Sequence, residues 1–175
     1  MIYITTEKLI LNLNDSKKFS FYYRKFNEGL NSGKVFNLFK YNINAININK
    51  KVKIVKKTSK VFFKKNNSTF DLIFIDGSHQ YKNVLFDINY SKKFLKNGGL
   101  IIGDDYEIKF SDIDFNILNS KKNNEDISFE NKKKISFHPG VTMAVYKHFG
   151  NIKPINGIFV IKKNRNKFLP YKFKI

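Results

Sequence analysis

The clearest pattern of hydrophobic and polar positions lies in the middle of the chain. Residues 70–75 form a nearly continuous apolar run, which is typical of a parallel strand that is covered on both faces. Residues 80–96 carry apolar side chains at helical spacing, and the Asn-Gly-Gly sequence at 97–99 is expected to end that helix. Residues 100–102 form a second apolar run. Strand, helix and strand within about 30 residues predict one βαβ unit with parallel strands.

Weaker patterns flank this unit. Before it, we expect a short strand at 2–4, helices at 16–31 and 34–46, and a strand at 52–55. After it, residues 107–137 are polar and rich in lysine and asparagine, with weak strand signals around Ile127 and Ile135. A helix at 141–148 and a late strand at 157–161 follow, and a short final strand is expected within the basic residues 163–175. The patterns together predict one α/β domain over residues 1–163, with an insertion at 107–137, and a basic tail at 164–175.

Length and composition narrow the class of protein. The chain has 175 residues, which suits one domain, and its 42% of hydrophobic residues can bury a core. Cysteine is absent, so disulfides and a thiolate nucleophile are excluded. The N-terminus resembles no secretory signal, and no apolar run is long enough for a membrane span. We therefore expect a cytoplasmic protein.

The strong positive charge is a weaker indication of function than its size suggests. Thirty-three basic and 14 acidic residues give a net charge of +19, but Arg24 and Arg165 are the only arginines. Abundant lysine, asparagine, isoleucine and phenylalanine are typical of an A/T-rich genome. A protein selected to bind nucleic acid normally keeps arginine for phosphate and base contacts. We therefore interpret the charge mainly as compositional, and nucleic acid as the less favoured partner.

Three aspartates follow the two predicted strands of the βαβ unit. Asp76 comes after the first, and Asp104 and Asp105 come after the second. The carboxyl ends of neighbouring parallel strands lie about 5 Å apart at the same edge of a sheet, where ligands of such sheets bind. Clustered carboxylates repel one another unless a cation or proton joins them, and oxygen ligands favour Mg²⁺ or another hard cation. Asp-Gly is also a common turn, so an ordinary loop remains the alternative.

The stretch from residue 70 to residue 106 carries the motifs IDG-x-H-x-Y and GG-hydrophobic-DDY. These motifs resemble those of class I S-adenosylmethionine-dependent methyltransferases, and within that class the macrocin-type O-methyltransferases. The sequence HPGVTMAV at 138–145 and the strand pattern at 157–163 resemble later parts of the same family. The resemblance implies a Rossmann-like α/β fold with a mostly parallel, doubly wound sheet and an antiparallel late strand. It also implies S-adenosylmethionine as the cofactor and a sugar or small hydroxylated molecule as the substrate.

The resemblance assigns roles to individual residues. In metal-dependent members of the family, the positions of Asp76, Asp104 and Asp105 hold Mg²⁺ or another divalent cation. The metal would lower the pKa of a substrate hydroxyl, and a base would remove its proton. The family often has an acidic residue at the position of Ser78, so the neighbouring His79 is the better candidate base here. We therefore predict His79 and Asp76 as catalytic residues, and Tyr81, Tyr106 and His138 as substrate contacts.

The N-terminal part of the chain, which is expected to bind the cofactor, departs from the family pattern. No glycine-rich turn of the form E-x-G-x-x-x-G follows an early strand. The acid that binds the ribose is replaced by Thr5 or, after a register shift, by Glu7, and Thr58-Ser59 stands where the family often has Asp-Ser near the adenine. These four residues and Asp76 are the predicted cofactor contacts. An N-terminally incomplete chain, a diverged chain without cofactor, and an active variant with another cofactor loop remain open.

Two functions of different classes follow. The first is a metal-assisted O-methyltransferase, and the second is a non-catalytic or truncated methyltransferase-like module that binds a partner or nucleic acid through its lysines. An NAD-dependent dehydrogenase is disfavoured, because no G-x-G-x-x-G sequence follows a predicted strand. A homo-oligomer is compatible with both.

Overall fold

A computed structural model describes residues 28–29 and 32–171 of the chain. The chain falls into two units, residues 1–57 and residues 58–175. In the first unit, helix α2 (Lys34–Ala45) is followed by the 3₁₀ helix η1 (Asn49–Lys51). Helix α2 confirms the helix predicted at 34–46. It buries Ile43, while Leu38 and Tyr41 are largely exposed.

Of the other predictions for the N-terminal part, most lie outside the described residues and one is wrong. The strand predicted at 2–4, most of the helix predicted at 16–31, and the candidate cofactor residues Thr5 and Glu7 lie outside the described residues. The strand predicted at 52–55 is wrong: only Val52 forms a single bridge, and residues 53–56 have no regular structure. Alternating apolar residues make a strand only when a neighbour pairs with them, and no described strand of the sheets pairs with 52–55.

The second unit contains an α/β sheet domain with a smaller sheet attached. Its elements, in chain order, are α3 (Ser59–Lys65), β1 (Phe70–Ile75), α4 (Tyr81–Phe94), β2 (Leu95–Gly103), η2 (Phe110–Asp112), α5 (Phe115–Lys121), β3 (Ser128–Glu130), β4 (Ile135–Phe137), α6 (Pro139–Phe149), β5 (Phe159–Asn164) and β6 (Lys167–Pro170).

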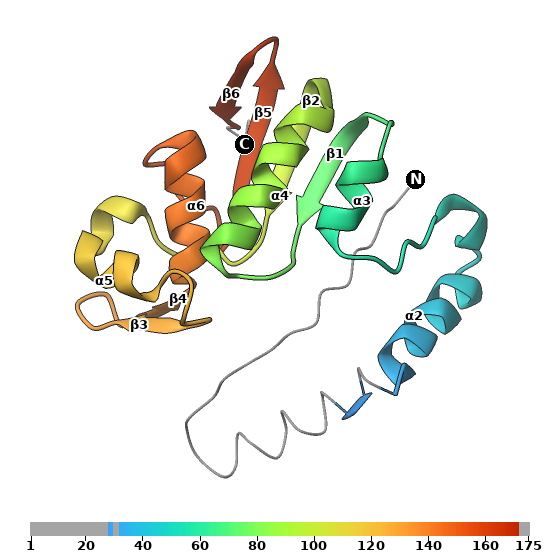
Figure 1. The fold of residues 1–175 in the computed structure, drawn as a ribbon, viewed down its shortest axis with the longest axis horizontal. Helices are drawn as coiled ribbons and strands as arrows, with labels where there is room; N and C mark the ends of the chain where they lie inside the picture. The colour runs from blue at the N-terminus through green and yellow to red at the C-terminus, as the bar shows by residue number, and fades with distance from the viewer. Residues whose placement is uncertain (1–27, 30–31, 172–175) are drawn as a thin grey trace. The chain divides into compact units, whose positions relative to one another are not determined.

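The main sheet has the strand order β1-β2-β5-β6 (Figure 1). Strands β1 and β2 are parallel, with Leu72 opposite Leu100 and Ile75 opposite Gly103, as the βαβ pattern predicts. Strand β5 runs antiparallel to β2, and β6 pairs antiparallel with β5. The Rossmann-like α/β fold, the antiparallel late strand and the short final strand are therefore confirmed.

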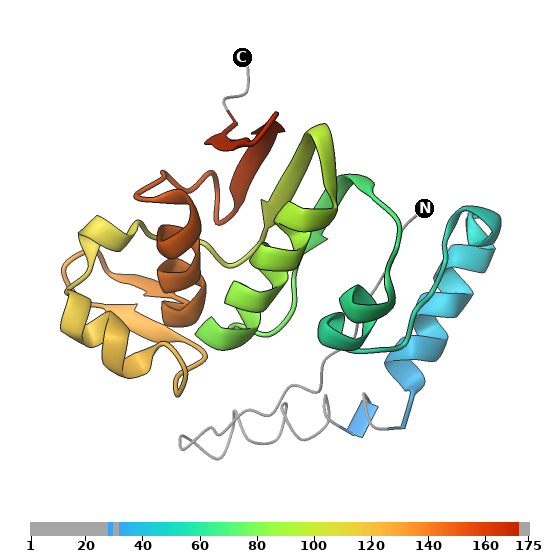
Figure 2. The same cartoon turned by 45° about the horizontal axis from the view of Figure 1, so that its top comes forward.

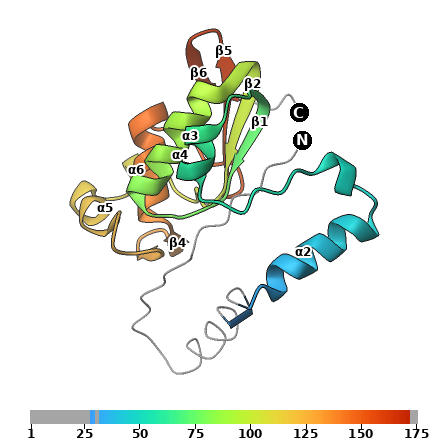
Figure 3. The same ribbon diagram turned by 45° about the vertical axis from the view of Figure 1, so that its right-hand side comes forward.

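Helices α4 and α6 lie side by side on one face of this sheet (Figures 1 and 3). The apolar spacing of α4 directs Val84 and Ile88 into the core, where they meet Val145 of α6 and Ile101 of β2. Pro139 begins α6, a position where its fixed φ and missing N–H cost nothing. This packing fixes the ends of β1 and β2 relative to the start of α6.

Two details of the βαβ unit correct the prediction. Among the described strands, β1 lies at an edge of the sheet. Its side chains Leu72 and Phe74 are 52% and 53% exposed, so β1 is not covered on both faces. Apolar character alone does not distinguish an edge strand from a central one. Helix α4 ends at Phe94, and the Asn-Gly-Gly sequence lies inside β2 instead of ending the helix.

The predicted insertion at 107–137 is more regular than its composition suggests. Besides the hairpin β3–β4, which matches the two weak strand signals, it contains η2 and α5. Asp114 caps α5 by accepting the backbone N–H groups of Asn116 and Ile117. Leu118, Phe137 and Met143 form a second small core where the insertion packs beside α6 (Figure 2). The insertion is therefore held at the end of the domain where β1 and β2 finish.

His148, near the end of α6, makes the fold sensitive to acid. Burial lowers its pKa, and Lys92 adds to this effect, while a hydrogen bond to the Leu85 backbone opposes it. Above pH 6.5 the imidazole is neutral in folded and unfolded chains. Below pH 6.5 the unfolded chain takes up a proton that the folded chain resists, so stability falls as the pH falls.

We expect the free energy of unfolding of the wild-type chain to drop, relative to that of His148→Asn, between pH 7 and pH 5. The drop per pH unit is smaller than roughly 1.4 kcal/mol, which is the change expected when the chain takes up one full proton on unfolding. Urea unfolding of both chains at each pH measures it, and the difference between the chains cancels the contributions of groups that titrate alike in both. A difference that stays constant with pH contradicts the prediction.

Candidate functional site

The three predicted aspartates meet where β1 and β2 end. Asp76 follows β1, Asp104 and Asp105 follow β2, and the Asp104 N–H donates to the Ile75 carbonyl at 3.0 Å. One carboxylate oxygen of each aspartate lies within 4.8 Å of the others. Burial, together with the negative charges of Asp104 and Asp105, raises the pKa of Asp76. The parallel pairing thus creates a compact set of oxygen ligands whose mutual repulsion a cation relieves.

Asp105 adopts a left-handed backbone conformation, with φ of 60°. This conformation is uncommon for residues other than glycine, although aspartate tolerates it better than most. Asp105 Oδ2 lies 2.8 Å from His79 Nε2, and Oδ1 lies 3.7 Å from His138 Nδ1. The hydrogen bond from His79 is the main reason that the pKa of Asp105 is lowered. Asp105 therefore joins the aspartate trio to two histidines.

His79 lies between two carboxylates. Its Nε2 faces Asp105, and its Nδ1 lies 2.7 Å from Asp126 Oδ1. Burial alone lowers the pKa of His79, but the hydrogen bonds and charges of the two aspartates outweigh burial and raise the pKa to about 10. At neutral pH the ring in this arrangement therefore carries a proton on each nitrogen and donates to both carboxylates.

His138 stands directly before α6, beside His79. The two imidazole ring centroids are 4.3 Å apart in an edge-to-face arrangement. Glu107 holds His138 twice, because Oε1 lies 2.7 Å from Nδ1 and Oε2 accepts the His138 backbone N–H at 3.2 Å. The structure thus places His138 at the same edge as Asp105, as the sequence suggested.

The two predicted tyrosines are placed differently. Tyr81 begins α4 and is half-buried between the two cores, with Lys122 Nζ 5.3 Å from its ring centroid. Tyr106 is fully buried, and its hydroxyl donates to the Ile152 carbonyl at 2.8 Å. Burial is also the main cause that raises the pKa of Tyr106. Tyr106 is a core residue in this structure and does not face an open substrate pocket.

The candidate cofactor residues Thr58 and Ser59 lie at the start of α3. The Thr58 hydroxyl caps that helix by accepting the Val61 N–H at 3.3 Å, and Ser59 is buried. The structure therefore gives Thr58 a local role in helix capping.

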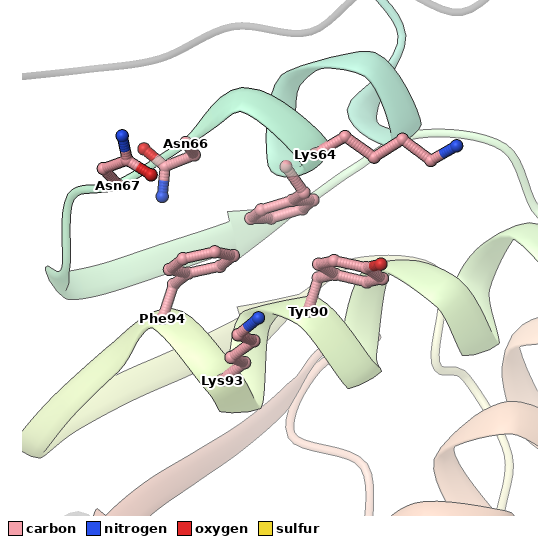
Figure 4. Close-up of a pocket in the computed structure, with 7 residues that line it drawn as sticks. Lys64, Asn66, Asn67, Tyr90, Lys93 and Phe94 are labelled. Atoms are coloured by element: carbon pink, nitrogen blue, oxygen red, sulfur yellow. The ribbon is translucent and has the colours of Figure 1, made fainter.

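The open cavities of the second unit include the following two. One, of about 480 Å³, lies between α3 and the last turns of α4 (Figure 4), at the end of the sheet where β1 begins, and so away from the aspartates. The second, of about 450 Å³, reaches the site through Glu107 and is bordered by Lys109, Lys133 and Lys153. Glu107, which bonds His138, is the residue that the second cavity shares with the site.

Asp126 and Glu107 are site residues that the sequence reasoning missed. Both belong to the insertion at 107–137, whose polar composition gave no periodic pattern to place them. Glu107 is two residues after Asp105, so its proximity in sequence was a usable signal. Asp126 is 47 residues from His79, and no local pattern could have brought the two together.

In α/β domains with parallel strands, ligands bind outside the carboxyl ends of those strands, which is where the acidic residues lie here. Comparison with known families narrows the class of protein: a family model described as a methyltransferase domain matches residues 13–106, more than half of the chain. The chain belongs to this family of methyltransferase domains.

A curated relative gives a shorter match. A segment of 37 residues is 49% identical to an uncharacterized protein of Acanthamoeba polyphaga mimivirus. The segment covers 21% of this chain and 17% of the mimivirus protein, so the chain matches only a small part of that relative's length. Among the helices of the described residues, none combines the length and apolar character that a membrane crossing requires.

Proposed function

We propose that the chain is an S-adenosylmethionine-dependent O-methyltransferase of the macrocin type, acting with a divalent cation on a sugar or small hydroxylated molecule. The observation that carries the proposal is the convergence of Asp76, Asp104 and Asp105 at one edge of the sheet in a chain of the methyltransferase family.

The donor set fits a hard divalent cation. All three ligand atoms are carboxylate oxygens, which Mg²⁺ prefers, with Mn²⁺ and Ca²⁺ as alternatives. Burial and repulsion from Asp104 and Asp105 raise the pKa of Asp76, and a cation would relieve the repulsion. When bound, the cation would hold an acceptor hydroxyl and lower its pKa.

The chain's own residues would orient the acceptor and carry its proton. Asp76, Asp104 and Asp105 would hold the cation. The His79 ring carries a proton on both nitrogens in this arrangement, so it would act as the base only after Nε2, which faces Asp105 at 2.8 Å, has lost its proton. The neutral ring would then take the hydroxyl proton on Nε2. His138 would contact the acceptor from the adjoining side, and half-buried Tyr81 would border the pocket. Methyl transfer then depends mainly on positioning and on fixed charges.

The cofactor contacts are proposed on the family pattern. Asp76 would lie next to the methionine part of S-adenosylmethionine, Thr58 and Ser59 would lie near the adenine, and Thr5 and Glu7 would lie near the ribose. Because the Thr58 hydroxyl already caps α3, its contact would use the backbone.

Calorimetry of the full chain with S-adenosylmethionine and MgCl₂ tests the proposal. We expect saturable binding, and formation of S-adenosylhomocysteine when a panel of sugars and phenols is added. Asp76→Asn is expected to lower Mg²⁺ affinity and product formation at least roughly tenfold.

Asp71→Asn is the matched control, because Asp71 is an exposed aspartate at the opposite end of the same strand, paired with Lys96 Nζ at 2.9 Å. We expect this variant to behave as the wild type. A folded chain that does not bind S-adenosylmethionine with or without Mg²⁺ refutes the proposed function.

A further inference from the structure

The insertion at 107–137 supplies a side chain to the centre of the site. Asp126 Oδ1 lies 2.7 Å from His79 Nδ1, and the two side chains are only 25% and 17% exposed. A carboxylate only accepts hydrogen bonds, so His79 Nδ1 is the donor in this contact. The opposite nitrogen, Nε2, is thereby directed at Asp105.

The turn that carries Asp126 is anchored independently of this contact. The Tyr81 N–H donates to the Lys122 carbonyl at 2.9 Å, and the Lys82 N–H donates to Asn123 Oδ1 at 3.3 Å. Both donors belong to the first turn of α4, directly after His79. The start of the turn at 122–126 is therefore fixed against the segment that follows His79, and the contact of Asp126 with His79 is not the only one that holds this turn.

A histidine with a carboxylate on one ring nitrogen has a fixed ring orientation and a fixed proton on that nitrogen. We propose that Asp126 is the positioning residue for His79, holding its ring so that Nε2 faces Asp105 and the acceptor hydroxyl. Asp126 acts through His79 and is not among the proposed cation ligands or cofactor contacts. The role in catalysis rests on the proposed function, but the ring geometry does not.

Side-chain NMR tests the geometry directly. The chain has three histidines, so ¹⁵N-histidine labelling of the full chain gives few ring signals, and His79→Gln assigns those of His79. We expect a slowly exchanging, low-field Nδ1–H signal in the wild type. Asp126→Ala is expected to abolish this signal, and Asp126→Asn, which keeps an acceptor oxygen, is expected to restore it.

Glu125→Ala is the matched control, because Glu125 precedes Asp126 and pairs with Lys121 at 2.9 Å instead of His79. It should leave the His79 signal unchanged. The inference is overturned if Asp126→Ala keeps the wild-type signal, or if Glu125→Ala loses it equally. Backbone amide spectra of each variant report the fold.

Kinetics separate positioning from a merely structural role. With an acceptor from the panel above, Asp126→Ala is expected to lower kcat roughly 10- to 100-fold with little change in KM for S-adenosylmethionine. An unchanged kcat overturns the catalytic part of the inference. If S-adenosylmethionine fails to bind while the NMR result holds, the proposed function fails and the positioning contact stands.

Discussion

Replacing Gly140 by alanine is expected to destabilise the second unit severely. A Cβ atom at this position would lie 2.1 Å from the His79 carbonyl oxygen, 2.5 Å from the Tyr81 nitrogen and 2.6 Å from the Lys122 carbonyl oxygen. All three are backbone atoms, so no side chain can rotate to make room. We expect the free energy of unfolding to fall by about 3 kcal/mol or more, a large share of the total for a domain of this size.

Gly77→Ala provides the control for this prediction. Its Cβ atom would meet a single side-chain oxygen of Asp87 at 3.8 Å, which is an ordinary contact. We expect the unfolding midpoint of Gly77→Ala to lie near the urea concentration of the wild-type midpoint. The midpoint of Gly140→Ala should lie at a much lower urea concentration, or this variant should already be unfolded when purified. If both variants unfold at the same urea concentration, the backbone around Gly140 is packed less closely against His79 and Lys122 than the structure indicates.

Asp105→Asn is expected to have the largest effect on the site itself. Asparagine tolerates the left-handed backbone at φ 60°, so the change removes charge without adding much strain. It leaves the cation one carboxylate fewer and leaves His79 with Asp126 as its one charged partner. We expect Mn²⁺ affinity, measured by electron paramagnetic resonance titration, to fall by more than roughly 100-fold, since residues that only touch metal ligands already cost 10- to 100-fold.

Asp112→Asn is the comparison for this change. Asp112 also belongs to the segment after β2, but it pairs with Lys133 at 2.7 Å and lies in none of the clusters described above. Its removal lowers the negative charge of the chain by the same amount. Mn²⁺ affinity should stay at the wild-type value, and an equal loss in both variants would mean that overall charge, not ligation, controls binding.

The parts of the molecule that sequence alone predicted are those with local patterns. The strand at 70–75, the helix α4 and the parallel pairing with β2 follow from apolar runs and spacing within about 30 residues. Because parallel strands end at one edge, the same pattern also predicted that Asp76 and Asp105 approach each other. The resemblance in motif then supplied the function class that the family match supports.

The parts that sequence alone missed depend on contacts between distant segments. Asp126 reaches His79 because α5 and the hairpin β3–β4 fold back beside α6. The lysine-rich composition of this insertion gives no hydrophobic pattern from which these elements could be predicted. The exposure of Leu72 and Phe74 depends on what packs on their face of the sheet, which the residues of β1 do not encode. Tyr106 was assigned by its place next to the aspartates, although its side chain turns into the core.

The left-handed backbone of Asp105 lowers the stability of the folded chain, whereas the Asp105 carboxylate belongs to the proposed site. A left-handed aspartate costs about 1 kcal/mol or more relative to glycine. In a library selected for heat resistance alone, glycine at residue 105 would relieve this strain but would lose the hydrogen bond and ion pair that His79 makes to Asp105. Descendants with glycine at this position would have no link between the aspartates and the histidines, so position 105 should be held fixed in any stability library.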